Sequence, residues 1–147
     1  SAPAAAVEPG DPPVILPEPA PAPVASRATA AAVCENSATA LCLAERFRVE
    51  MDWRDSQNRT GAGQTAPLRS SDSGIFWFFS PANWETLAKI VNGCSYNGHY
   101  WVFGAALTNV EYTLRITDTV TGRQVRYTNP LGVSSPAIVD TSALPCD

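Results

Sequence analysis

Few side chains in this sequence could carry out covalent chemistry. His99 is the only histidine, so a Ser-His-Asp or Cys-His arrangement would have to use it. It directly follows Asn97-Gly98, which signals a turn, and polar residues are common beside turns. We therefore expect no catalytic role for His99.

Paired carboxylates could supply the acid and the base of glycoside hydrolysis. Glu50 and Asp52 lie two residues apart, so they share one face of a predicted strand. Arg48 and Arg54 flank them on that face. This pattern indicates a solvated charged surface rather than a catalytic pair.

A metal site has weak support. Asp52, Asp55 and Asn58 could offer oxygen atoms to calcium, but they lack the ligand spacing and the glycine of a calcium-binding loop. We expect no metal, no other cofactor and no enzymatic activity.

Lys89 is the only lysine, and its parity is that of Leu87 and Val91, so it is expected to point toward the core. A buried lysine could form an amide crosslink to an asparagine with loss of ammonia. A side chain that snorkels to the surface is the simpler interpretation.

The four cysteines lack the CxxC spacing and the histidine partners that zinc sites use. Their even number predicts disulfides formed in an oxidising compartment. Three pairings are possible, and we favour Cys34–Cys42, which closes a short loop, with Cys94–Cys146, which would fix the C-terminal tail.

Candidate glycosylation sites are few. Asn58-Arg59-Thr60 is the single N-glycosylation sequon and lies in a predicted exposed loop. Ser26 and Thr29 lie beside a Pro/Ala-rich tract and are candidates for O-linked sugar.

The composition divides the chain into an arm, residues 1–33, and a body, residues 34–147. Eight of the 13 prolines lie in the first 32 residues, whereas all four Trp, all four Tyr and all five Phe lie in the body. Alternating prolines favour an extended, semi-rigid backbone. The arm residues expected to contact another subunit are Val14, Ile15, Leu16, Pro17, Pro19, Pro21, Pro23 and Val24.

The body alternates apolar and polar residues with a period of two, which predicts strands. About seven strands are expected, near residues 47–53, 65–68, 74–79, 87–93, 100–107, 110–116 and 125–127. A helix from Ser80-Pro81 also fits the spacing, but Asn97-Gly98 predicts a type I′ hairpin and favours a strand from about Leu87. The fold class is therefore an all-β antiparallel sandwich, immunoglobulin-like or jelly-roll.

Two of these strands are apolar on both faces. The residues that give them this pattern are Phe76, Trp77, Phe78, Phe79, Tyr100, Trp101 and Phe103. In a sandwich, one face of each sheet normally meets water, so something must cover the second face. The cover could be a loop or the C-terminal tail tied by Cys146, the arm of the same chain, or the arm of a neighbouring copy.

Charge and hydropathy exclude several partners. The net charge is −4, and the arginines are isolated rather than in basic blocks, which disfavours nucleic acid and anionic membranes. No run of 18 apolar residues is present, so no membrane insertion is expected. The start of the sequence lacks a charged-then-apolar leader, so we expect a secreted, extracellular chain whose signal peptide has been removed.

Four aromatic motifs resemble a β-sandwich module of secreted bacterial proteins. They are FRVE at 47–50 with Trp53, IFWFF at 75–79, NGHYWVF at 97–103 and LTNVE at 107–111. The resemblance covers about Cys34 to Cys146 and implies no catalytic residues. With the arm included, the plan is similar to that of bacterial extracellular filament subunits assembled by strand donation.

The leading hypothesis is a structural subunit of an extracellular bacterial fibre that polymerises head to tail with copies of itself. An extended arm of about 30 residues reaches about 90 Å, against a gyration radius of about 13 Å for such a domain. The alternative is a carbohydrate-binding or adhesive module, with Trp84 and Tyr96 as exposed aromatics. A third possibility is a protease inhibitor that presents a loop from Thr60 to Pro67.

Overall fold

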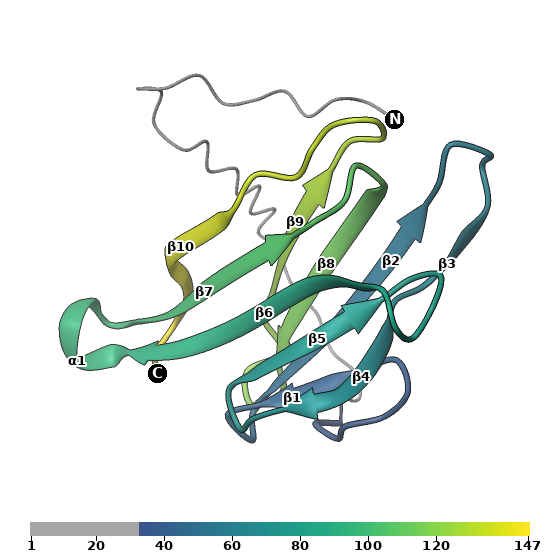
Figure 1. Ribbon diagram of the computed structural model, residues 1–147. Coiled ribbons are helices and arrows are strands. Elements are labelled where there is room, and N and C mark those ends of the chain that lie inside the picture. Colours follow the sequence, from purple (N-terminus) through teal and green to yellow (C-terminus); the bar gives the residue numbers. More distant parts are fainter. Residues whose placement is uncertain (1–32) are drawn as a thin grey trace.

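The computed structural model describes residues 33–147 (Figure 1). The predictions for the arm lie outside the described residues. These are the extended conformation of the proline tract, the subunit contacts of Val14, Ile15, Leu16, Pro17, Pro19, Pro21, Pro23 and Val24, and the glycan sites Ser26 and Thr29.

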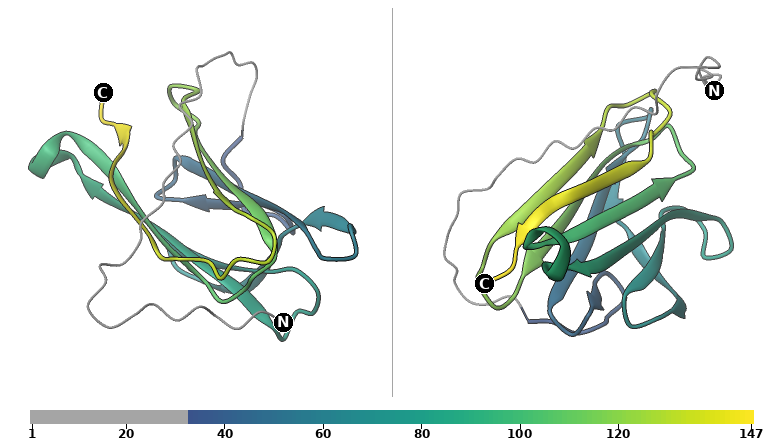
Figure 2. Two further views of the ribbon diagram at one scale, coloured as in Figure 1. Left: turned by 90° about the horizontal axis from the view of Figure 1, so that it is seen from above. Right: turned by 90° about the vertical axis from the view of Figure 1, so that its left-hand side faces the viewer.

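The described chain forms two antiparallel five-stranded sheets, which Figure 2 shows as two layers. The first sheet, sheet A, has the order β1-β2-β8-β9, and β3 also pairs with β2. Its strands are β1 (Leu41–Leu43), β2 (Phe47–Arg54), β3 (Thr60–Ala62), β8 (Glu111–Asp118) and β9 (Gln124–Asn129).

The second sheet, sheet B, has the order β10-β7-β6-β5-β4. Its strands are β4 (Gln64–Arg69), β5 (Ser73–Trp77), β6 (Trp84–Gly93), β7 (His99–Ala106) and β10 (Ile138–Pro145). The short helix α1 (Cys94–Asn97) joins β6 to β7 at the tip of a long hairpin (Figure 1). The expectation of an all-β antiparallel sandwich is confirmed at this level.

Alternation places one face of each sheet in the core. In sheet A the strand β2 buries Phe47, Val49 and Met51, while the residues between them remain partly or fully exposed. In sheet B the strand β7 buries Val102 and Ala106. The largest fully buried side chains include Tyr127, Phe47, Phe76, Leu41, Leu43, Met51, Ile90, Leu114 and Ile116.

The number of strands is higher than predicted, because ten are present among the described residues. The seven predicted segments are all strands, and the segment from Trp84 is β6 rather than a helix. The three additional strands are β1, β3 and β10. β1 and β3 have only three residues each, which is too short for a visible alternation. β10 contains several polar residues and a break in register between Asp140 and Leu144, so its alternation is interrupted.

The predicted type I′ turn at Asn97-Gly98 is wrong. The chain makes one helical turn, α1, and only Gly98 has a positive φ, of 78°, whereas a type I′ turn needs two such residues. The side chain of Asn97 is held in place, since its amide donates to Thr141 O at 2.7 Å and accepts from Trp101 Nε1 at 2.9 Å. These contacts favour the helical turn over the tighter one.

Both predicted disulfides are present. Cys34 is bonded to Cys42, and Cys94 to Cys146, with sequence separations of 8 and 52 residues. The second bond attaches the chain after β10 to the α1 turn. Two disulfides are compatible with an extracellular protein.

An ion-pair network lies where the β1–β2 turn meets the C-terminal residues. The Arg46 guanidinium donates two hydrogen bonds of 2.7 Å to the fully buried Asp118, and others to Asp147 at 3.0 Å and to the Tyr100 hydroxyl at 3.2 Å. Burial acts to raise the pKa of Asp118. The hydrogen bonds from Arg46 and from the backbone of Val120 outweigh burial and hold that pKa below its ordinary value.

Candidate functional site

The outer face of sheet B is apolar, and it is the most unusual surface of the described chain. The inward residues of β6 are Thr86, Ala88 and Ile90, so the residues between them point outward. On β5 and β7 the odd-numbered residues likewise point outward, because the buried residues of these strands have even numbers. A register shift between β5 and β6 pairs Trp84 with Trp77 and so brings Trp84 to the outward side as well. We name as the apolar face the outward residues Ile75, Trp77, Trp84, Leu87, Val91, Trp101, Phe103, Ala105 and Val139.

Strand pairing makes the apolar face continuous. Val91 lies opposite Trp101, and Leu87 lies opposite both Ala105 and Ile75. At one end Trp77 pairs with Trp84. Leu87 is 48% exposed and Val139 is 42% exposed, so residues 33–147 leave a substantial part of this face accessible.

The outer face of sheet A has the opposite character. Its outward residues on β2 and β8 include Arg48, Glu50, Asp52 and Arg115, and they form ion pairs across the two strands. Glu50 lies 2.9 Å from Arg48, and Asp52 contacts Arg115. These acids are neutralised by neighbouring arginines on an open face, where salt bridges contribute little stability.

Gly93 allows Trp101 to lie flat on the sheet. A Cβ atom at Gly93 would come within 2.2 Å of two atoms of the indole ring, so only glycine fits beneath it. The ring continues an aromatic row along β7, with centroids 5.6 Å from Tyr96 and 6.4 Å from Phe103. Tyr96 is 80% exposed at the tip of the hairpin.

Lys89 lies at the centre of the apolar face, which corrects the expectation that it points toward the core. Its parity is indeed that of Leu87 and Val91, but all three point outward because β6 turns Ala88 and Ile90 inward. The Lys89 ammonium lies 5.4 Å from the centroid of the Phe103 ring, a cation–π contact. The amide crosslink is therefore not supported.

The residues predicted to accept an arm divide between the core and the surface. Phe76 and Phe78 are buried core residues, so they are not available to another chain, whereas Tyr100 is half-buried against the core beside Arg46. Trp77, Trp101 and Phe103 belong to the apolar face. Phe79 is exposed at the end of β5 and packs edge-on against Trp53. For the surface residues, the role as acceptor stays a prediction.

Five members of this face were not predicted from the sequence, namely Ile75, Leu87, Val91, Ala105 and Val139. The signal was present in the run Leu87-Ala88-Lys89-Ile90-Val91, where apolar residues occupy both parities. A strand of that kind is typical of a sheet covered on both sides.

The C-terminal tail does not cover the apolar face. Its strand β10 pairs antiparallel with β7 and so extends sheet B at its edge. The Tyr127 hydroxyl of β9 donates to Asp140 of β10 at 2.7 Å, which links the edges of the two sheets. Burial, and then the Asp140 carboxylate, raise the pKa of Tyr127.

The described chain begins on the opposite side of the sandwich. The carbonyl of Val33 accepts a 3.1 Å hydrogen bond from Arg48, and Cys34 is bonded to Cys42; both partners point outward from sheet A. The arm therefore joins the body at the polar outer face. The whole thickness of the sandwich separates this point from the apolar face.

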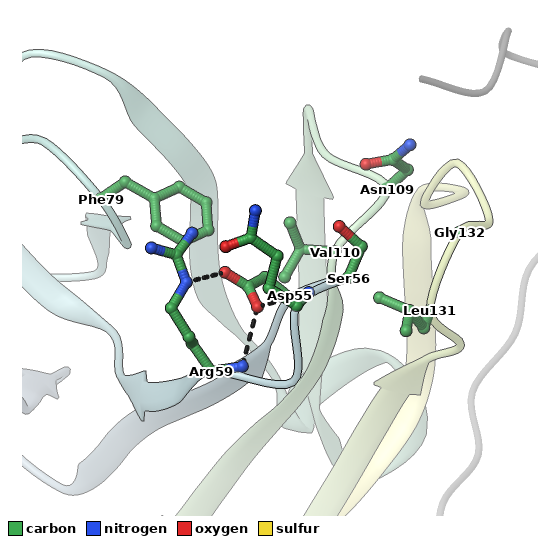
Figure 3. A pocket seen from close by; sticks show the side chains of 9 residues that line it. Asp55, Ser56, Arg59, Phe79, Asn109, Val110, Leu131 and Gly132 are labelled. Carbon is green, nitrogen blue, oxygen red and sulfur yellow. Dashed lines mark hydrogen bonds and ion pairs between the residues drawn. The ribbon is translucent and has the colours of Figure 1, made fainter.

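A cavity of about 460 Å³ lies at the loop end of the sandwich (Figure 3). It is lined by the β2–β3 loop together with Phe79, Val110 and Leu131. Asp55 is buried at its edge and accepts hydrogen bonds from Arg59 Nε and from backbone N–H groups. Burial acts to raise the pKa of Asp55, but these hydrogen bonds outweigh it and lower the pKa.

The arrangement at Asp55 does not form the calcium site considered from sequence. Asp55 turns toward Arg59, and Asp52 contacts Arg115 on the outer face. Asn58 is exposed with a φ of 66°, and its side-chain oxygen accepts a hydrogen bond from Arg54 at 3.1 Å. Its glycosylation stays a prediction.

The remaining candidates occupy ordinary structural positions. His99 starts β7, and its Nδ1 lies 3.0 Å from the backbone oxygen of Asn97. The segment from Thr60 to Pro67, considered as an inhibitor loop, is instead occupied by β3 and the first part of β4. The predicted loop is therefore wrong, because most of this segment is paired into the two sheets.

Comparisons with protein-family models, with curated proteins and with solved structures found no match. Among residues 33–147, no helix is long and apolar enough to cross a membrane.

Proposed function

We propose that this protein is a non-enzymatic structural subunit of an extracellular bacterial fibre. In this proposal the N-terminal arm of one copy lies across the apolar face of the next. The resulting contacts are heterologous, because two different surfaces meet, and they repeat head to tail. Secretion and an immunoglobulin-like or jelly-roll type of sandwich belong to the same proposal.

The apolar face is the observation that carries the proposal. Antiparallel sandwiches usually present a polar outer face to water, as sheet A does here. A continuous apolar surface with Leu87 48% exposed is instead typical of an interaction site.

The arm is the occupant that the chain itself supplies. It contains the apolar triplet Val14-Ile15-Leu16 and many prolines, which match a flat apolar surface better than a polar one. Because the arm joins the body at the polar face, beside Arg48, it would have to cross the thickness of the sandwich to reach the apolar face of its own body. About 30 extended residues reach about 90 Å, which is enough to cross to a neighbour.

Purified full-length protein tests the proposal by negative-stain microscopy and light scattering. We expect filaments from the wild type, and monomers after deletion of residues 1–33 or after Leu87→Asp. Val120→Asp is the matched control, because Val120 is 65% exposed in the β8–β9 turn, away from the apolar face. Filaments that persist without the arm would refute the proposal.

The aromatic row favours a second candidate, a carbohydrate-binding module. Tyr96, Trp101 and Phe103 form a partly exposed row of rings, and Trp84 is 46% exposed on the same face. Aromatic faces bind apolar ligand surfaces. Binding on a glycan array by the arm-deleted protein, lost in Trp84→Ala or Trp101→Ala, would favour this function over the fibre.

A further inference from the structure

Lys89 is the only charged residue on the apolar face. Its neighbours on that face are Leu87 and Val91 along β6, Phe103 on β7 and Ser73 on β5. The ion pairs within residues 33–147 do not include Lys89. Its ammonium instead contacts the Phe103 ring at 5.4 Å.

Covering this face would remove water from the Lys89 ammonium. A charge that loses water is costly unless an opposite charge or hydrogen-bond acceptors replace it. An occupant that fits the apolar face therefore needs an apolar surface with a carboxylate placed at one position. An apolar occupant without a carboxylate at that position therefore fits the apolar face less well than one that has it.

The arm carries such a pattern. Glu18 lies three residues after Ile15. The polyproline conformation has three residues per turn and a rise of about 3.1 Å per residue, so these two side chains point to one side, about 9 Å apart. Leu87 and Val91 flank Lys89 on β6, so apolar surface lies on both sides of the ammonium.

We infer that Glu18 of one copy pairs with Lys89 of the next and so sets the register of the arm on the apolar face. This inference rests on the proposed fibre function. With Glu18 at Lys89, Ile15 lies over the apolar residues beside Lys89 on β6. The arm has Arg27 as its single basic residue, so acidic groups dominate it, in agreement with the charge of Lys89.

Charge reversal in the full-length chain tests the inference. Lys89→Glu and Glu18→Lys should each raise the critical concentration for assembly by about thirty-fold or more, the loss that follows removal of one partner of a buried charge pair. The double variant should restore assembly, because the two charges are exchanged. Asp11→Lys is the matched control, since it makes the same charge change seven residues from Glu18, which is not a multiple of the three-residue turn, and should leave assembly near wild type.

The outcomes separate this inference from the proposal on which it rests. If the wild type forms no assembly at any concentration, the fibre proposal fails and the inference fails with it. If the wild type assembles but the double variant is no better than the single ones, or Asp11→Lys is as harmful as Glu18→Lys, the register inference alone is overturned. Thermal unfolding of each variant confirms that the body remains folded.

Discussion

The Arg46–Asp118 pair offers a sharp test of the described fold. Asp118 has no solvent exposure, and Arg46 is 16% exposed, so replacing Asp118 by alanine leaves a mostly buried guanidinium without its main partner. Breaking a buried pair of this kind costs about 3–5 kcal/mol. Domains of this size have about 5–15 kcal/mol of unfolding free energy, so the loss is a large fraction of the total.

Asp147 provides the comparison within the same network. It also pairs with Arg46, at 3.0 Å, but its side chain is 59% exposed. Exposed pairs contribute about 1 kcal/mol or less. Urea denaturation followed by tryptophan fluorescence should therefore give a large shift for Asp118→Ala and a small one for Asp147→Ala. Equal effects of the two variants, or a loss below about 1 kcal/mol for Asp118→Ala, would refute the reasoning.

The same pair predicts a pH dependence. The folded pKa of Asp118 lies below the ordinary value of about 3.9 for an unfolded aspartate. Its contribution is therefore complete above that value and is lost as the pH falls through the folded pKa. The stability difference between wild type and Asp118→Ala should be constant near neutral pH and should shrink below about pH 4. A difference that grows on acidification would contradict this sign.

Three further perturbations follow from particular contacts. Replacing Cys94 and Cys146 together by serine should lower the unfolding free energy by about 4 kcal/mol, from the 52-residue separation; an unchanged urea midpoint would contradict it. Gly93→Ala should displace the Trp101 ring, shift tryptophan emission to the red and cost about 1–3 kcal/mol; an unshifted spectrum would argue against the packing described. Tyr127→Phe removes a 2.7 Å hydrogen bond to a carboxylate and should cost about 1.5–3 kcal/mol in urea denaturation; a neutral effect would show that the link between the sheets is weak.

The strands were largely predictable because alternation reports burial directly. The segment around Val49 alternates cleanly between Phe47 and Met51, and those positions are buried as expected. The disulfide pairing was also chosen correctly, from loop length and position. The alternation and the short loop closed by Cys34–Cys42 depend on local sequence.

The orientation of Lys89 and the conformation at Asn97 depended on contacts that local sequence does not contain. Both faces of β6 are apolar, so alternation alone did not decide which parity points inward. Packing against sheet A did, since Leu41 of β1 lies against Gly74, the partner of Ala88 on β5. The turn before Gly98 is shaped by contacts with β10, far along the chain. The sequence predicts which residues of a strand share a face. Which of the two faces is buried depends on the packing of the second sheet.

The two outer faces of the sandwich differ in chemistry, so its two sides are not equivalent. One side is charged and carries the attachment point of the arm beside Arg48, and the other is apolar around Leu87. In a head-to-tail assembly the two ends are then chemically different, since one terminal subunit has a free arm and the other an uncovered apolar face. Each assembly then has one uncovered apolar face whatever its length. The area of uncovered apolar surface per unit mass therefore falls as the assembly grows.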